Sequence, residues 1–339
     1  MCSYNIPPTA GASLLTNLLM MYNLIVMIKK TFRKIGIGIL IFLGIVILFL
    51  LILTAIHRVL LSAEQERIIP NGQLIEMNGH FMHVYVEGDN DNSPLLVFLS
   101  GGGTSAPVYD FKPLYSLLAD EYKVAVVKKI GYGYSEIADV PRDIDTILSE
   151  TRASLSAVGE SGPYVLIPHS MSGLEALRWA QLYPDEVMGI IGIDMAIPSV
   201  YIDGLVEVPS LQIALMSMFT YMGIHRFLPV SDLSLTAEEH MQAKLLFYRN
   251  TINISFINET RSVLDHAKTV QDNDTPEVHF LLFASSELGD KWVLYQKEFA
   301  LQNNAKIELF DCGHYIHHYE QERIAELIHV FISDLYKYR

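Results

Sequence analysis

The chain has 339 residues, 24 basic and 38 acidic side chains, and a formal charge of −14 at neutral pH. The charge is unevenly distributed, because the first 58 residues hold 5 basic and no acidic residues, which leaves −19 on the remainder. Nucleic acids and polyanionic substrates are therefore not expected as partners. The two cysteines, Cys2 and Cys312, support no disulfide framework, and their scarcity fits an exported protein without structural disulfides.

The first informative segment is the uncharged run at residues 35–56, which is dominated by Ile, Leu, Val and Phe. A helix of this length, rising 1.5 Å per residue, crosses a hydrocarbon core of about 30 Å. Basic residues cluster before it in residues 29–34, whereas Glu64 and Glu66 follow it. The positive-inside bias then predicts a single-pass anchor in the cell membrane, with the N-terminus cytoplasmic and the rest of the chain extracytoplasmic.

The leader at residues 1–34 allows two further interpretations. Its apolar stretch at residues 14–28 is interrupted by polar residues and could form a second span in a hairpin. The preferred hypothesis is that translation starts at Met27, because the basic residues that follow it resemble the start of a signal anchor. A cleaved signal peptide is disfavoured, since residues 54–57 make a poor cleavage site. Residues 57–72 are expected to be a linker.

About 280 residues follow the anchor, enough for one large domain with an insertion. Two strands at residues 74–77 and 80–86 flank Asn78 and Gly79, a strong hairpin signal. Later apolar runs alternate with helical stretches, as buried parallel strands do; they lie at residues 95–99, 123–127, 164–167, 189–193, 278–283 and 306–310. The pattern predicts an α/β fold, with a mostly parallel twisted sheet flanked by helices.

The run of strands and helices is interrupted between residues 197 and 271, where the sequence becomes helix-like and rich in methionine. We expect a helical cap there, inserted into a core formed by residues 73–196 and 272–339. The apolar cap side chains favour binding of an acyl chain or a hydrophobic leaving group, although they could equally form the packing surface between cap and core.

The most distinctive motif is at residues 168–173, where an apolar strand turns sharply into a helical pattern with Ser170 at the apex. Such a turn strains the serine backbone and exposes its hydroxyl above the sheet. Ser170 is therefore the candidate nucleophile. Ser172 and Gly173 provide the small side chains that the turn requires on its helical side, and Pro168 stands where glycine is commoner.

A serine nucleophile needs a histidine base and an acid that orients it. His314 follows the strand at residues 306–310 and precedes a helical pattern that begins near Gln321. The acid is expected after the strand at residues 278–283, with Glu287 preferred and Asp290 second. Asp194, which ends the strand at residues 189–193, is a third alternative.

In chain order these motifs resemble the α/β-hydrolase superfamily over residues 73–338. The resemblance includes a glycine-rich loop at residues 98–103, a G-x-G-x-S turn at residues 131–135, and Gly313-His314 near the end. It implies acyl transfer through Ser170, with an oxyanion hole formed by the backbone amides of Met171 and Gly102, or Gly103 in place of Gly102.

The expected function is a membrane-anchored serine hydrolase that acts on a carboxylic ester, with small-molecule esters or amides as substrates and the lipid bilayer as a partner. The alternatives are a small-peptide or amide hydrolase of the same fold, or a noncatalytic hydrolase-like binding domain. Aspartate-nucleophile dehalogenases and epoxide hydrolases are disfavoured by the serine itself. No cofactor is expected, and no metal, because no carboxylate or cysteine near His317 and His318 in the sequence completes a ligand set.

Overall fold

A computed structural model describes residues 9–207, 209–230 and 233–337 of the chain. The chain forms two compact units, Met1–Arg58 and Val59–Arg339. The first unit is built on the long helix α1, and the second contains the sheet with its covering helices. Each unit is described by itself.

Helix α1 runs without interruption from Thr9 to Gln65. Its segment Leu14–Gln65 is long and apolar enough to cross a membrane, with a mean hydropathy of 3.3 in its most apolar window. The expected boundaries at residues 35 and 56 are therefore not helix ends, and the leader continues the helix instead of forming a hairpin. No proline breaks the helical hydrogen bonds between Thr9 and Gln65, so the polar interruptions in the leader do not end the helix. Residues 1–8 of the leader lie outside the described residues, and the crossing of a membrane by residues 35–56 stays a prediction.

The second unit contains an eight-stranded sheet. Its strands are β1 (Gln73–Met77), β2 (His80–Glu87), β3 (Leu95–Leu99), β4 (Val124–Lys128), β5 (Tyr164–Pro168), β6 (Val187–Ile193), β7 (His279–Ser285) and β8 (Lys306–Phe310). Their spatial order is β1-β2-β4-β3-β5-β6-β7-β8. Strands β1 and β2 form the predicted antiparallel hairpin, β2 pairs antiparallel with β4, and all further pairings are parallel. The mostly parallel sheet predicted from the sequence is confirmed.

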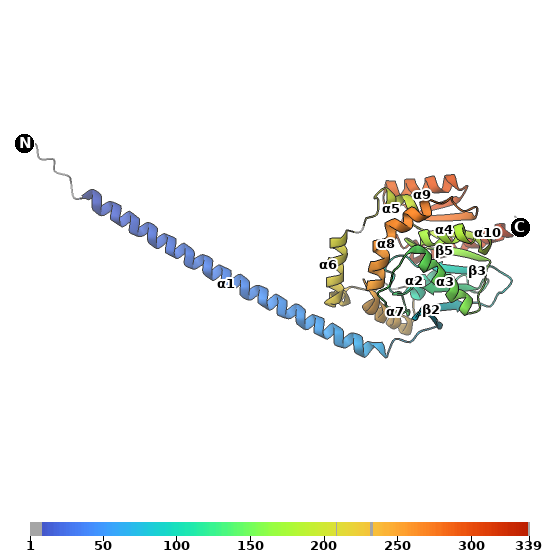
Figure 1. The fold of residues 1–339 in the computed structure, drawn as a ribbon, viewed down its shortest axis with the longest axis horizontal. Helices are drawn as coiled ribbons and strands as arrows, with labels where there is room; N and C mark the ends of the chain where they lie inside the picture. Colours follow the sequence, from blue (N-terminus) through green and yellow to red (C-terminus); the bar gives the residue numbers. More distant parts are fainter. Residues whose placement is uncertain (1–8, 208, 231–232, 338–339) are drawn as a thin grey trace, which may run out of the picture. The chain divides into compact units, whose positions relative to one another are not determined.

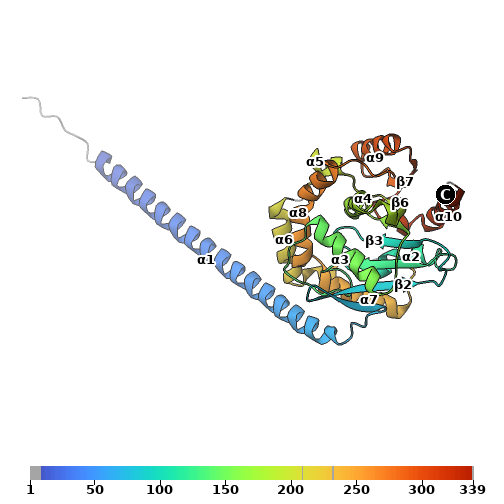
Figure 2. The same cartoon turned by 45° about the vertical axis from the view of Figure 1, so that its right-hand side comes forward.

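Helices cover the sheet on both faces (Figures 1 and 2). The α-helices that the structure describes after α1 are α2 (Pro107–Tyr115), α3 (Ile144–Ala157), α4 (Ser172–Leu182), α5 (Pro198–Ile202), α6 (Ser210–Tyr221), α7 (Ala237–Asn250), α8 (Ile254–Gln271), α9 (Asp290–Gln302) and α10 (Gln321–Lys337). The described residues also form the short 3₁₀ helices η1 (Pro184–Glu186), η2 (Ile224–Phe227) and η3 (Ile316–His318). Helices α5 to α8 and η2 fall between β6 and β7, where the sequence predicts a helical cap.

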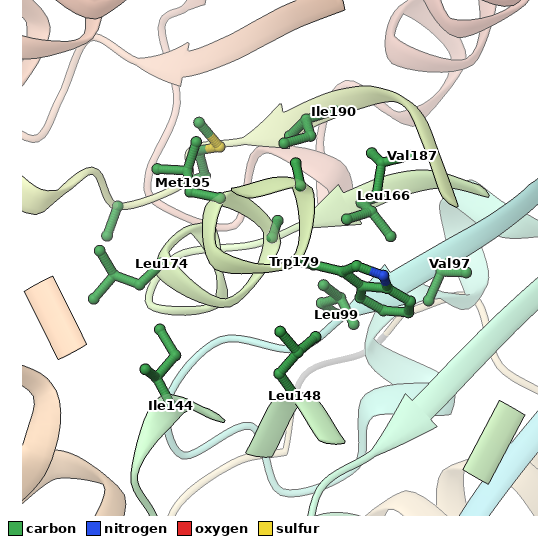
Figure 3. Packing of buried hydrophobic residues seen from close by; sticks show 14 of the residues in the cluster. Val97, Leu99, Ile144, Leu148, Leu166, Leu174, Trp179, Val187, Ile190 and Met195 are labelled. Carbon is green, nitrogen blue, oxygen red and sulfur yellow. The ribbon is translucent and has the colours of Figure 1, made fainter. Parts of the chain in front are cut away.

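Successive side chains of the central strands point into two separate cores, as the two-residue strand period requires. In β3, Val97 packs on the face covered by α3 and α4, whereas Phe98 packs on the face covered by α2 and α10. Figure 3 shows the first core, in which Trp179 of α4 lies among Val97, Leu166 and Leu148. Because both faces are buried, the strand ends are held rigidly, and loops at the carboxyl ends of the parallel strands are positioned precisely.

Candidate active site

The predicted sharp turn is present between β5 and α4. Ser170 has a left-handed backbone with φ of 54°, a strained conformation for a residue with a side chain. The turn also requires the glycine that follows it, because a Cβ at Gly173 would lie 2.2 Å from the carbonyl oxygen of Ala196. The local sequence therefore brings the Ser170 hydroxyl to the end of the sheet that carries the other site residues.

Three side chains form a continuous hydrogen-bonded chain at this end of the sheet. The distance from His314 Nε2 to Ser170 Oγ is 2.8 Å, and the distance from His314 Nδ1 to Asp194 Oδ2 is 2.6 Å. Because the Asp194 carboxylate accepts, Nδ1 carries the imidazole proton and Nε2 is free to accept the proton of the Ser170 hydroxyl. This arrangement has the geometry of a nucleophile, a general base and an orienting acid.

Asp194 is held by donors other than the histidine. Its Oδ1 accepts hydrogen bonds from the Ser285 backbone amide at 3.0 Å and from the Trp292 indole at 2.7 Å, and the side chain is fully buried. Asp194 itself has a left-handed backbone with φ of 45°, which turns it inward directly after β6. One carboxylate oxygen therefore fixes the residue, and the other faces His314.

The preference for Glu287 as the partner of His314 is not supported by the geometry. Glu287 lies in an exposed turn after β7, and Asp290, the second choice, is the exposed first residue of α9. Both carboxylates face solvent. Asp194, the third alternative, follows β6, which pairs directly with the strand that carries Ser170. Strand adjacency, which the sequence does not fix, brings this carboxylate to the histidine.

The glycine-rich loop packs against the turn that carries Ser170. A Cβ at Gly101 would lie 2.8 Å from the Cβ of Ser170, so only glycine allows this approach. The backbone amides of Gly102 and Met171 donate to no acceptor within the described part of the chain. In contrast, the Gly103 amide donates to the Tyr132 hydroxyl at 3.2 Å. The two free amides are the ones that the sequence predicts as first choices for an oxyanion hole.

His169, next to Ser170, is a buried residue that sequence reasoning did not single out. Its Nε2 lies 3.2 Å from the carbonyl oxygen of His314, so this nitrogen donates and the loop that presents His314 is fixed to the turn. Burial, together with the neighbouring His317 and His314, keeps the pKa of His169 well below its usual range. His169 is therefore uncharged at neutral pH, and its hydrogen bond connects the turn of Ser170 to the loop of His314.

A second group of imidazoles lies beside the site. Asp110 of α2 places Oδ2 3.1 Å from His317 Nε2 and Oδ1 3.0 Å from His318 Nε2; we call these three residues the Asp110 cluster. No local sequence pattern points to this carboxylate, which is about 200 residues away from the two histidines.

The Asp110 cluster has the nitrogen and oxygen donors that suit a transition metal, and its ligand atoms lie within 4.8 Å of one another. A metal-bound histidine normally donates its second ring N–H to a partner. His317 Nδ1 is buried and has no partner within the described residues. The two hydrogen bonds to Asp110 account for the arrangement of the cluster.

A cavity of about 320 Å³ adjoins the glycine-rich loop at Gly103. Its wall combines apolar and polar side chains, including Tyr109, Asp110, Phe247 and His318.

Cys312, in the loop before His314, is half-buried, and burial with nearby carboxylates raises the pKa of its thiol to about 11. The thiol is therefore protonated at neutral pH and does not compete with Ser170 as a nucleophile.

Comparison with known proteins agrees with this architecture. The sequence model of the alpha/beta hydrolase family matches residues 96–327. The uncharacterized protein YbdG of Bacillus subtilis strain 168 is 34% identical over 289 residues, covering 80% of this chain and 88% of YbdG.

Solved structures share the fold at lower identity. The epoxide hydrolase CorEH is 20% identical, with a TM-score of 0.58 over 78% of this chain and 98% of CorEH. The haloalkane dehalogenase DbeA from Bradyrhizobium elkani USDA94 is 17% identical, with a TM-score of 0.56 over 79% of this chain and 99% of DbeA. The family match, which spans most of the sheet and its helices, shows that the chain belongs to the alpha/beta hydrolase family and is a hydrolase by fold.

Proposed function

We propose that the chain is a serine hydrolase that cleaves a carboxylic ester through an acyl-enzyme on Ser170. The observation that carries the proposal is the continuous hydrogen-bonded chain from Ser170 through His314 to Asp194. A surface serine does not normally meet a histidine that is itself oriented by a buried carboxylate. The Met171 and Gly102 amides, which donate to no acceptor within the described residues, are candidates for the oxyanion donors that acyl transfer also requires.

The first half of the reaction follows from the direction of these hydrogen bonds. Ser170 Oγ attacks the ester carbonyl carbon while its proton passes to His314 Nε2. Asp194 stabilises the imidazolium, and the amides of Met171 and Gly102 donate to the oxyanion that develops on the carbonyl oxygen. The carbon–oxygen bond of the ester then breaks, and the leaving alkoxide takes the proton from His314, which leaves an acyl group on Ser170.

The second half repeats the proton transfers with water. His314 accepts a proton from a water molecule that attacks the acyl carbon, and the same amides stabilise the second oxyanion. The bond to Ser170 breaks, the proton returns to Oγ, and the carboxylic acid leaves. Each half needs Nδ1 to remain protonated and hydrogen-bonded to Asp194, because Nε2 must accept.

The cavity beside Gly103, whose lining does not include Ser170 or His314, has room for a modest, largely uncharged acyl or alcohol part of a substrate. Its volume of about 320 Å³ is near the lower end of the range for small-molecule sites. Phe247 provides apolar wall, whereas the carboxylate of Asp110 disfavours an anionic group in the cavity. Esters are preferred to amides as the first class to test, since an alkoxide leaves more readily than an amide anion.

We also propose that α1 anchors the hydrolase unit to the cell membrane, with the N-terminus in the cytoplasm. The apolar run and the basic residues before it support this orientation. Proteinase added to intact spheroplasts should then digest residues 59–339 while sparing the N-terminal peptide. Protection of the hydrolase unit until the cells are lysed would contradict the orientation.

The experiment that tests the proposed chemistry is labelling of the full chain, in detergent, with a fluorophosphonate probe. Wild type should be labelled on the peptide that contains Ser170, whereas Ser170→Ala and His314→Ala should not be labelled. Ser149→Ala is the matched control, because Ser149 is an exposed serine on α3 whose hydroxyl donates to the Thr146 carbonyl of the same helix. This control should be labelled like wild type.

The labelled protein is then compared with unlabelled protein on a panel of short-chain and medium-chain esters and the corresponding amides. Hydrolysis that the probe abolishes, faster on esters, is the expected result. A folded wild-type chain that takes no label and cleaves no ester would overturn the proposed function and favour a noncatalytic binding domain.

A further inference from the structure

A buried ionic network joins helix α8 to the loop that follows β4. Lys129 Nζ lies 2.5 Å from Glu259 Oε1, and both side chains are almost fully buried. The Tyr132 hydroxyl donates to the other oxygen, Oε2, at 2.7 Å. Glu259 therefore connects a helix of the insertion between β6 and β7 to the G-x-G-x-S turn that contains Tyr132.

The network continues to the glycine-rich loop. The Tyr132 hydroxyl, whose proton is donated to Glu259, accepts the backbone N–H of Gly103 at 3.2 Å. The direction is fixed, because burial and the charge of Glu259 raise the pKa of Tyr132 well above its usual range and the hydroxyl keeps its proton. A path of two hydrogen bonds thus runs from α8 to Gly103.

The charge of Glu259 is maintained despite its burial. Burial alone would raise its pKa, but the charge of Lys129 and the hydrogen bonds from Lys129 and Tyr132 outweigh this effect and lower it. Glu175, which lies 3.6 Å from Lys129, has a pKa that burial raises. The ammonium therefore pairs mainly with Glu259, and Glu259 remains a strong acceptor for Tyr132.

Helix α8 also touches the loop directly. Phe256 precedes Glu259 by three residues, so both side chains lie on one side of the helix. A Cβ placed on Gly102 or on Gly103 would be 3.4 Å from the Phe256 ring. One side of α8 thus contacts the loop through an aromatic ring and holds it through Tyr132.

The loop needs such support because of its own sequence. Residues 101–103 are three consecutive glycines, the residue type that loses most conformational freedom when it is ordered. Without side chains, residues 101–103 form hydrogen bonds through their backbone alone; within the described residues these are the bond from the Thr104 amide to the Gly101 carbonyl at 3.4 Å and the bond from Gly103 to Tyr132. The latter fixes the peptide plane next to Gly102, whose amide donates to no acceptor within the described residues.

We propose that Tyr132 and Glu259 are positioning residues, which hold the glycine-rich loop so that the Gly102 amide can stabilise the oxyanion. The proposal rests on the proposed function. If it is right, the catalytic rate depends on the position of α8 against the glycine-rich loop. Neither residue needs to touch the substrate. Lys129 and Tyr132, which are not part of the triad, thereby have a role in positioning the glycine-rich loop.

The test compares Tyr132→Phe with Tyr134→Phe in the full chain. Both variants remove one buried hydroxyl from the same loop, but Tyr134 bonds to Tyr109 and Gln242 and not to the glycine-rich loop. Loss of a complete oxyanion donor costs roughly 10²- to 10³-fold in kcat, so loss of its positioning should cost less, about tenfold to 100-fold. Tyr132→Phe should show this decrease in kcat with KM changed less than about twofold, because the interaction is used only when the oxyanion forms. Tyr134→Phe should keep kcat near the wild-type value.

A second measurement distinguishes positioning from a general loss of structure. Binding of a trifluoromethyl ketone, which forms an oxyanion on Ser170, should weaken in Tyr132→Phe by the same factor as kcat/KM falls. Glu259→Gln retains an oxygen that accepts from Tyr132 and should lose less activity than Tyr132→Phe. An unchanged ketone affinity, or a decrease in kcat that equals that of Tyr134→Phe, would overturn the proposal.

A third measurement needs no substrate. Backbone hydrogen–deuterium exchange of residues 100–105 should accelerate in Tyr132→Phe and not in Tyr134→Phe, since only the first variant releases the Gly103 amide. Equal exchange in both variants would overturn the positioning role even if the wild type is an active esterase. Conversely, faster exchange in Tyr132→Phe together with an inactive wild type would overturn the proposed function while confirming that Tyr132 holds the loop.

Discussion

Asp194 and Asp110 each accept hydrogen bonds from imidazoles, but only the imidazole on Asp194 reaches a hydroxyl. His314 uses Nδ1 for Asp194 and Nε2 for Ser170. In the Asp110 cluster, His317 and His318 both direct Nε2 to the carboxylate. The two arrangements contain the same chemical groups and differ in which ring nitrogen the carboxylate occupies.

This difference decides whether an imidazole can transfer a proton or only forms a fixed hydrogen bond. An imidazole held at Nδ1 can accept a proton at Nε2 and return it, with the carboxylate stabilising the cation. An imidazole held at Nε2 and buried at Nδ1, as His317 is, has no exposed nitrogen with which to exchange a proton. The Asp110 cluster therefore joins α2 to η3, close to the loop of His314, and we expect it to contribute to stability more than to chemistry.

The largest expected effect comes from Asp194→Asn. The asparagine oxygen can occupy the Oδ1 position and retain the bonds from Ser285 and Trp292, which places its amide against His314. Nδ1 must then lose its proton in order to accept, so Nε2 becomes protonated and cannot take the proton of Ser170. Loss of the correct tautomer should lower kcat for ester hydrolysis by roughly 10³- to 10⁴-fold.

Glu287→Gln is the control for that prediction, because Glu287 is exposed and does not bind His314 within the described residues. Its kcat should remain within about twofold of wild type. Steady-state kinetics of both variants on the same ester measure the two kcat values. If Glu287→Gln proved to be the more damaging change, the assignment of the acid to Asp194 would be wrong.

The next effect is expected from Asp110→Ala. This change removes both hydrogen bonds of the cluster and leaves buried imidazole nitrogens without an acceptor, which costs about 1–3 kcal/mol per buried group. The free energy of unfolding should fall by a value in this range, measured by urea denaturation of the full chain in detergent. The kcat of the remaining folded protein should change far less than in Asp194→Asn.

His240→Ala is a suitable comparison for Asp110→Ala, since the partly exposed His240 of α7 forms no side-chain hydrogen bond with the Asp110 cluster. It should change the unfolding free energy by less than about 0.5 kcal/mol, as surface substitutions usually do. A loss of kcat in Asp110→Ala as large as in Asp194→Asn, at unchanged stability, would show that the cluster takes part in the chemistry.

The features of the site that depend on contiguous sequence were predictable. Strand β5, the turn at Ser170 and the position of His314 follow from runs of a few residues whose pattern is set by local backbone requirements. The Gly102 and Met171 amides were named from the resemblance to the α/β-hydrolase superfamily, and their role as oxyanion donors stays a prediction.

The partners of these residues were not predictable, because they depend on the spatial order of strands and helices. Glu287 and Asp194 are both carboxylates after buried strands, and only the packing of β6 against β5 brings Asp194 to His314. Asp110 reaches His317 only because α2 packs against η3. Likewise, the sequence contains the Lys129–Glu259 pair with no pattern that joins the two residues.

The last effect, which extends the comparison to a histidine without a carboxylate, is the pH dependence of stability caused by His83. Burial first, and the neighbouring Lys128 second, lower the pKa of His83 to about 2. Its folded form is therefore neutral, whereas the unfolded chain binds a proton below a pKa of about 6.5. Because the unfolded state binds the extra proton, the stabilising contribution of the neutral His83 is fully present above pH 6.5 and is lost as the pH falls, at up to about 1.4 kcal/mol per pH unit.

In His83→Phe, which keeps a ring against Tyr134, the slope of the unfolding free energy against pH between about pH 6 and pH 4 should be smaller by nearly that amount. Urea denaturation across this pH interval measures both slopes, and equal slopes would mean that His83 is accessible to protons in the folded chain.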